Sequence, residues 1–375
     1  MNRVEGHILT GAGFVAGTLE MGADGRIARI SGSPVESPGV RDADRSIVLP
    51  GFIDLHVHGG GGHDVMDAGD AALRVAEAHA LHGTTSILAT TMTAPTEDLV
   101  AAFSALAPHA RTRGKASARI LGIHLEGPFV NPGKLGAQPD FVRPLGLDEV
   151  RRLNAIAPIR LITLAPEIPG HLDAIAQLRS EGIVVQIGHS LATYEEAREA
   201  LARGAAGFTH LFNAMSAFHH RSPGAAGAAL AHAQYAEIIP DFLHVHPGAI
   251  RAALRAIPHL YCVTDSTAAA GMPDGEYRLG RQTVSKCLGG VRLADGTLAG
   301  STLTMDQALR NLVESLGMDL AEASRRVSTI AARYLGMDDR GTLVAGAWAD
   351  IVVVNRDLAL SHVFVEGEEV DLAQA

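Results

Sequence analysis

Histidines and carboxylates stand at the ends of several apolar, β-rich runs in this chain. His56 and His58 close the run GFIDLHVH, and Glu126 closes RILGIHLE. Because side chains alternate across a strand with a period of two, both imidazoles of the H-x-H pair face the same side. Imidazoles and carboxylates bind Zn²⁺ and similar divalent ions, which lower the pKa of a bound water. The pattern therefore predicts a metal-dependent hydrolase site built from His56, His58, Glu126, His189, His210, His244 and Asp265.

Eight runs of this kind alternate with amphipathic, Ala/Leu-rich stretches, which is the pattern of repeated βα units. Capping boxes predict helix starts at Thr193 (T-x-x-E) and Thr304 (T-x-x-Q). Eight units predict an α/β fold with a (β/α)8 TIM-type barrel, in which the C-terminal strand ends converge on one face. The predicted strands cover residues 51–58, 84–90, 119–127, 160–167, 184–190, 207–214, 236–245 and 260–266.

The two ends of the chain differ from its middle. Residues 1–50 and 340–375 are rich in glycine, aspartate and alternating β-branched residues and contain no convincing helical pattern. We expect both flanks to form one small β-sandwich domain and residues 51–339 to form the catalytic barrel. Glycines 59–62 are expected to form a loop over the metal, where missing side chains leave room for substrate.

Composition excludes several classes of partner. The chain of 375 residues carries a net charge of −10 and lacks a Lys/Arg run, so a nucleic-acid partner is not expected. It lacks both a signal-peptide pattern and an apolar window of about 18 to 20 residues, so no membrane association is expected. The only cysteines, Cys262 and Cys287, fit a reducing compartment and a cytoplasmic enzyme.

Longer motifs extend through nearly the whole chain. They are PGFIDLHVHG, HLEGPFVNPGKLGA, GHS, THLFNAM, DFLHV, VTDS, LAGSTLTM and GTLVAGAWADIVVV. These motifs resemble those of the amidohydrolase superfamily, and specifically of the N-acetylglucosamine-6-phosphate deacetylases. The resemblance implies metal-dependent hydrolysis of the acetamide of N-acetyl-D-glucosamine 6-phosphate to D-glucosamine 6-phosphate and acetate, in amino-sugar catabolism and recycling.

The resemblance also implies roles for single residues. It implies one or two divalent ions per subunit, Zn²⁺ first, although Fe²⁺, Co²⁺ or Mn²⁺ can use the same ligands. The principal ligands would be Glu126, His189 and His210, and His56 and His58 would bind a second ion bridged by Glu126. Asp265, among these ligands, would be the catalytic acid/base. The sugar phosphate would be held by Ala137, Gln138, Asn213, Ala214, Arg221, His244, Leu298, Ala299 and Gly300.

Phosphate recognition is assigned to Arg221 and His244, and the resemblance implies a homodimer in which one such residue comes from across the interface. Arg221 suits a bidentate phosphate contact. Two positions depart from the family pattern. Gln138 replaces a common histidine and can donate a hydrogen bond but cannot carry a proton. Phe242 stands where glycine is usual and is expected to narrow the pocket.

Other functions remain open at this point. The chain could be an N-acetylgalactosamine-6-phosphate deacetylase, or another N-acyl amidohydrolase such as an N-acyl-D-amino-acid deacylase. Cyclic-amide hydrolases usually carry a carboxylated lysine on the fourth strand, whereas this strand ends LAPE. An inactive homologue with a binding or structural role would typically lack metal ligands, and this chain retains all of them.

Overall fold

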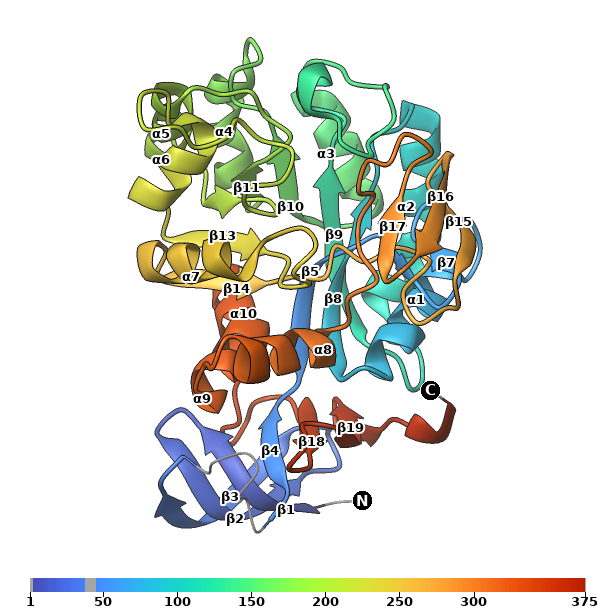
Figure 1. Ribbon diagram of the computed structural model, residues 1–375. Helices are drawn as coiled ribbons and strands as arrows, with labels where there is room; N and C mark the ends of the chain where they lie inside the picture. Colours follow the sequence, from blue (N-terminus) through green and yellow to red (C-terminus); the bar gives the residue numbers. More distant parts are fainter. Residues whose placement is uncertain (1–2, 38–44, 375) are drawn as a thin grey trace.

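The computed structural model describes residues 3–37 and 45–374, so residues 38–44 of the expected β-domain lie outside the described part. Six parallel strands form one sheet, and two further parallel strands continue its curvature (Figure 1). The six are β5 (Phe52–Val57), β8 (Thr84–Thr91), β9 (Arg119–Glu126), β10 (Ile159–Leu164), β11 (Val184–Ile187) and β12 (Gly207–Phe208), and the two are β13 (Tyr235–Ile238) and β14 (His259–Cys262).

Backbone contacts close these strands into a barrel. Leu211 N–H donates to the carbonyl of Glu237 at 2.9 Å and so links β12 to β13. Asp265 N–H donates to the carbonyl of His56 at 2.9 Å, and Val57 forms a parallel bridge with Ser266, which links the end of β14 to β5. The predicted (β/α)8 barrel is confirmed.

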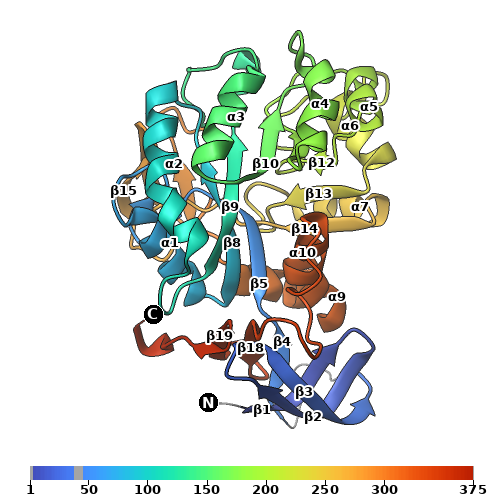
Figure 2. The ribbon, with the colours of Figure 1, turned by 180° about the vertical axis from the view of Figure 1, so that it is seen from behind.

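Helices follow the strands and cover the outside of the barrel (Figure 2). Strand β8 is buried at every position, because the barrel interior covers one face and helices cover the other. Among the residues that the structure describes, no helix is both long and apolar enough to cross a membrane. The helices are α1 (Ala71–Ala80), α2 (Thr96–Arg111), α3 (Leu147–Ile156), α4 (His171–Ser180), α5 (Tyr194–Ala202), α6 (Gly224–His232), α7 (Pro247–Ala256), α8 (Met305–Arg310), α9 (Leu320–Ser324) and α10 (Ile330–Tyr334).

Short irregular helices complete the chain. The π-helical turn η3 (Asn311–Ser315) extends α8, and η4 (Arg325–Thr329) joins α9 to α10. The 3₁₀ turns are η2 (Pro132–Lys134) and η5 (Leu372–Gln374).

The two predicted helix caps differ in outcome. Thr193 forms the full capping box of α5, accepting from Glu196 N–H at 3.2 Å while the Glu196 carboxylate accepts from Thr193 N–H at 2.8 Å. Thr304 does precede α8, but its hydroxyl lies beside the carboxylate of Asp306 instead of capping the helix. The Gln307 amide donates to Asn311 at 2.8 Å, so the second predicted capping box is wrong.

Both ends of the chain meet in a separate seven-stranded sheet (Figure 1). Strand β4 lies between β1 and β18, parallel to the first and antiparallel to the second. The sheet has its own apolar core, which includes Ile8, Ile351 and Phe364. The expected β-domain from both termini is thus confirmed, as one continuous sheet, while its exact boundaries stay a prediction. Its strands are β1 (Arg3–Thr10), β2 (Gly13–Met21), β3 (Ile27–Val35), β4 (Ile47–Pro50), β18 (Ile351–Val354), β19 (Leu360–Val365) and β20 (Glu368–Glu369).

Two small sheets were not predicted. The antiparallel strands β15 (Gly275–Leu279), β16 (Gln282–Cys287) and β17 (Gly290–Arg292) are inserted between β14 and α8, and the hairpin β6 (Gly59–Gly60) and β7 (His63–Asp64) follows β5. Their signals are alternating residues around Gly280 and Gly289, both with positive φ, which are typical of hairpin turns.

Candidate metal centre and substrate pocket

Three ligand atoms form a nearly regular triangle at the C-terminal end of the barrel. Glu126 Oε1, His189 Nε2 and His210 Nε2 lie 3.1 Å from one another. Ligand atoms about 2.0 to 2.1 Å from a tetrahedral ion are separated by about 3.3 to 3.4 Å, close to this spacing. We call this group the first metal position.

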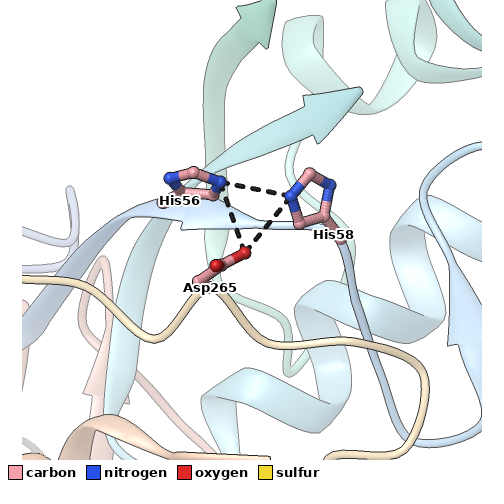
Figure 3. Close-up of side chains that lie close together, drawn as sticks. All are labelled: His56, His58 and Asp265. Atoms are coloured by element: carbon pink, nitrogen blue, oxygen red, sulfur yellow. Dashed lines mark hydrogen bonds and ion pairs between the residues drawn. The ribbon is translucent and has the colours of Figure 1, made fainter. Parts of the chain in front are cut away.

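A second group of ligand atoms lies beside the first. His56 Nε2 and His58 Nε2 are 3.1 Å apart, and both lie 3.3 to 3.4 Å from Asp265 Oδ1 (Figure 3). Glu126 Oε2 lies 3.4 Å from His56 Nε2 and 3.1 Å from His58 Nε2. The Glu126 carboxylate therefore turns one oxygen to each group. We call the group of His56, His58 and Asp265 the second metal position.

The other ring nitrogens of these histidines are mostly held by the protein. Nδ1 of His58 lies 3.1 Å from the Thr90 carbonyl, and Nδ1 of His189 lies 2.7 Å from the Lys134 carbonyl. A carbonyl can only accept, so Nδ1 carries the proton and Nε2 keeps the lone pair that a metal needs. These donor atoms and their tautomers fit a divalent metal ion.

Charge at the site also favours a cation. Burial alone lowers the pKa of His58, but Asp265 and Glu126 raise it to about 9. Burial likewise lowers the pKa of His56, and Glu126 and Asp265 raise it well above its usual value. Burial raises the pKa of Asp265, yet His56 and His58 lower it to about 2. The negative charge of Glu126 and Asp265 thus favours protonation of the nearby imidazoles, and a bound divalent cation would balance the same charge in place of those protons.

Three of these residues have strained backbones. His189, His210 and Asp265 adopt φ values of +47°, +29° and +51°, in the left-handed region that favours glycine. Such residues cost about 1 to 3 kcal/mol each and concentrate at functional sites. The strain turns each chain sharply just past its strand. Nothing in the residue types indicates this conformation.

A pocket of about 220 Å³ opens above the two metal positions. His58, Glu126, His189, His210 and Asp265 form part of its lining. Met92, Leu279 and Thr297 also line the pocket, and sequence reasoning missed them. Leu279 belongs to the unpredicted β15–β17 sheet and Thr297 follows it. Of the residues expected to hold substrate, the pocket is lined by Ala137, Gln138, Asn213, Ala214, His244, Leu298 and Gly300.

Three expectations about the pocket do not match its lining. The side chain of Ala299 is fully buried in the core cluster with Leu279 and Val284. Arg221 is exposed on the loop before α6, where its Nη1 lies 2.9 Å from His220 Nε2, outside the pocket of its own chain. Phe242 packs against the barrel core, so it does not narrow the pocket as expected.

Gln138 is held in one orientation at the pocket wall. Its Oε1 accepts from Thr93 N–H at 2.6 Å, and its Nε2 donates to Glu126 Oε2 at 2.6 Å. The amide nitrogen therefore faces the metal centre. Gln138 can present a hydrogen-bond donor there, although it cannot carry a proton.

His244 also lines the pocket, and its imidazole is paired with a carboxylate. Its Nδ1 donates to Asp241 Oδ2 at 2.6 Å, while Asp241 Oδ1 accepts from the backbone N–H groups of Leu243 and His244. Burial lowers the pKa of His244, but Asp241 outweighs burial, so the pKa lies above its usual value. The pocket thus has a carboxylate-rich metal centre and a histidine whose protonated form is favoured by Asp241.

The glycines after His58 have a different role from the one expected. Gly61 and Gly62 form the turn of the β6–β7 hairpin with φ values of +59° and +86°. A Cβ at Gly59 would lie 2.5 Å from Ala268 N, so glycine is required for close packing there. These glycines lie outside the pocket lining, so they do not leave room for substrate.

The family described as "Amidohydrolase family" matches residues 47–370. The chain belongs to the amidohydrolase family. This amidohydrolase is 40% identical to the N-acetylglucosamine-6-phosphate deacetylase of Lysinibacillus sphaericus, with 92% of this chain and 91% of that protein covered. It is also 40% identical to the N-acetylgalactosamine-6-phosphate deacetylase of Escherichia coli O157:H7, with 92% and 93% covered.

Solved structures agree with these relatives. The N-acetylglucosamine-6-phosphate deacetylase of Thermotoga maritima matches this amidohydrolase with a TM-score of 0.90 at 31% identity, covering 98% of this chain and 99% of that one. A mutant of the Mycobacterium smegmatis deacetylase, in complex with N-acetyl-D-glucosamine 6-phosphate, matches with a TM-score of 0.88 at 37% identity and 97% coverage of both chains.

Proposed function

We propose that this amidohydrolase hydrolyses the acetamide of N-acetyl-D-glucosamine 6-phosphate to D-glucosamine 6-phosphate and acetate, in amino-sugar catabolism. The observation that carries this proposal is the presence, in one pocket, of a two-position metal centre and of His244, whose cationic form Asp241 favours. The metal centre suits the cleavage of an amide, and His244 suits an anionic group on the same small substrate. Deacetylases of amino-sugar phosphates among the relatives support it.

The metal requirement follows from the donor set. Glu126, His189 and His210 would hold one ion, and His56 and His58 would hold another together with Asp265. A divalent ion bound there supplies Lewis acidity, which lowers the pKa of water and polarises the acetamide carbonyl. We propose Zn²⁺, which favours nitrogen and carboxylate ligands at such spacing, with Fe²⁺, Co²⁺ or Mn²⁺ as substitutes.

The protein's own groups then move the protons. Asp265 is ionised, so it can accept a proton from the attacking water and return it to the departing amine. Gln138 Nε2, held by the Thr93 contact, can donate a hydrogen bond to the oxygen that gains negative charge. His244 would bind the phosphate while the acetamide lies at the metal centre.

We further propose a cytoplasmic homodimer in which Arg221 reaches the phosphate in the partner's pocket. In support, Arg221 is exposed, and Phe218 on the same loop is 58% exposed and offers apolar area for a contact. The free thiols of Cys262 and Cys287 are in keeping with a reducing compartment.

A second substrate is favoured by one observation. Identity to the N-acetylgalactosamine-6-phosphate deacetylase of Escherichia coli O157:H7 equals identity to the N-acetylglucosamine-6-phosphate deacetylase of Lysinibacillus sphaericus, at 40% each. The two sugars differ only in the configuration of one hydroxyl, so N-acetylgalactosamine 6-phosphate is the alternative substrate of the same site.

Acetate release from a panel of N-acetyl sugars, with and without the 6-phosphate, tests the function. We expect N-acetylglucosamine 6-phosphate to be turned over much faster than the free sugar. In the variant Asp265→Asn, which removes the acid/base, kcat should fall about 10²- to 10⁴-fold. Equal turnover of phosphorylated and free sugars would contradict phosphate recognition. Faster turnover of the galactosamine substrate would select the alternative.

A further inference from the structure

Glu237 is a buried carboxylate that lies outside the pocket lining. It belongs to β13, between the apolar residues Ala236 and Ile238, and is fully buried inside the barrel. Burying an unpaired carboxylate is costly, so its hydrogen bonds indicate what the protein gains from it. Because it does not line the pocket, Glu237 acts through other residues.

The Glu237 carboxylate contacts a ligand of each metal position. Its Oε2 lies 3.0 Å from Nδ1 of His56, which belongs to the second position. The same oxygen accepts from the backbone N–H of His210, in the first position, at 3.1 Å. Its Oε1 accepts from the hydroxyl of Tyr261 at 3.3 Å.

The contact with His56 sets which nitrogen faces the metal. A carboxylate acceptor fixes the proton on Nδ1, so that Nε2 presents its lone pair to Glu126 and Asp265. His58 and His189 use neutral backbone carbonyls for the same purpose, so among the described contacts of these three Nδ1 atoms only that of His56 is with a carboxylate. A charged acceptor makes the imidazole a stronger ligand.

The contact with His210 supports a strained turn. His210 has a φ of +29°, and Leu211 N–H donates to the Glu237 carbonyl at 2.9 Å. Side chain and backbone of Glu237 thus hold two successive residues. The nearby ring of His124 cannot replace Glu237 as a hydrogen-bond partner of these ligands. Its Nδ1 lies 3.2 Å from the Leu55 carbonyl and its Nε2 lies 2.7 Å from the Thr163 hydroxyl, so both nitrogens already have partners. Those contacts also argue against a metal ion between His56, His124 and Glu237.

We propose that Glu237 is a positioning residue for both metal positions, holding His56 by a charged hydrogen bond and His210 through its backbone. The charge of Glu237 governs metal affinity at the second position, because His56 contacts the carboxylate with its imidazole ring whereas His210 contacts it only with its backbone N–H. This inference rests on the metal dependence proposed above, but its test needs no substrate and so stands even if the substrate is another amide.

Calorimetric titration of the metal-free enzyme with Zn²⁺ tests the proposal. Glu237→Gln can keep the contacts with His56 and His210 through its amide oxygen and removes the charge. It also replaces the oxygen that accepts from the Tyr261 hydroxyl by an amide nitrogen, so this contact needs a control of its own. We expect affinity at the second position to fall about 10- to 100-fold and affinity at the first to stay within about threefold. His58→Gln, which removes a ligand of the second position alone, identifies which binding event belongs to that position.

Tyr261→Phe is the matched control, because it removes the third contact of Glu237 and touches neither ligand. Both Zn²⁺ affinities should stay within about threefold of wild type in this variant. The proposal is overturned if Glu237→Gln leaves both affinities unchanged, or weakens them equally. If Glu237→Gln does not fold, Glu237→Asp, which withdraws the carboxylate by one methylene, is judged by the same criteria.

Discussion

At the scale of single residues, Asp241 determines whether His244 can bind an anion. Three N–H groups converge on its carboxylate, and one of them is the His244 imidazole. His244 is largely buried, and burial without a partner would lower its pKa and make it neutral. Asp241 reverses this effect, so the charge of His244 depends on a neighbour that lies outside the pocket lining.

We therefore expect Asp241→Asn to raise KM for the phosphorylated substrate about tenfold with a smaller change in kcat. His244 is charged below its pKa and loses that charge as pH rises through it, so KM should rise with pH in the wild type. In Asp241→Asn the rise should begin at lower pH, because burial then lowers the His244 pKa. Steady-state kinetics across pH checks this, with the unphosphorylated sugar as control. Superimposable KM profiles would contradict it.

At the scale of elements, the β6–β7 hairpin ties the second metal position to the eighth strand end. Both His58 N–H and Gly59 N–H donate to the Ser266 carbonyl, at 2.9 and 3.0 Å. His79 of α1 closes the arrangement, since its Nε2 lies 3.1 Å from both the Gly59 carbonyl and the Ser266 hydroxyl. A movement of this hairpin is therefore passed on to His58 and Asp265.

A methyl group at Gly59 should disturb this arrangement. Gly59→Ala places Cβ 2.5 Å from Ala268 N and from the His63 carbonyl, so we expect a loss of about 1 to 3 kcal/mol in the free energy of unfolding. The affinity of the second metal position for Zn²⁺ should fall in this variant as well. Gly62→Ala is the matched control: its Cβ meets only the Met272 side chain, at 3.5 Å, and its positive φ costs about 1 kcal/mol. Denaturant unfolding and Zn²⁺ titration distinguish the two, and equal effects would argue against the coupling.

The sequence predicted the barrel because each unit carries its own signals, an apolar run followed by an amphipathic helix. It also predicted that His56, Glu126 and Asp265 would meet, since a parallel barrel brings C-terminal strand ends together. Glu237 was missed, although a charge inside an apolar strand marks it. Arg221 and Ala299 do not line the pocket of their own chain, because motif position alone does not tell which side chain of a loop faces a pocket.

At the scale of the whole molecule, Glu366 joins the terminal sheet to the barrel. It follows β19 and accepts from Arg119 of β9 at 2.7 and 2.8 Å and from Arg113 at 3.3 Å. It also pairs with Arg340, which contacts Asp350 as well. Burial raises the pKa of Glu366, but Arg119 and Arg340 outweigh it and lower the pKa to about 2.

Glu366→Gln should lower the free energy of unfolding by about 3 kcal/mol at neutral pH, since it removes the carboxylate paired with the largely buried Arg119 and one of the two carboxylates paired with Arg113 and with Arg340. A depressed pKa gives stability above the usual value of 4.5 that is lost as pH falls towards 2. The difference from wild type should therefore shrink across that window. Glu368→Gln is the matched control: it pairs with Arg113 at a site 32% exposed, and should cost less than about 1 kcal/mol. Tm measured against pH checks both, and a constant difference down to pH 2 would exclude Glu366 as the cause.

Only Gly51 separates β4 of the terminal sheet from β5 of the barrel. Its N–H donates to the Asp350 carbonyl at 2.9 Å, and any Cβ there would lie 2.3 Å from the Thr85 side chain. The strand that carries His56 is thus anchored by a sheet whose partner strand β18 follows the whole barrel in the sequence. A growing polypeptide on the ribosome cannot complete this sheet until β18 has emerged. We therefore expect truncations that remove β18 to yield proteins that retain metal poorly, although every ligand is still present.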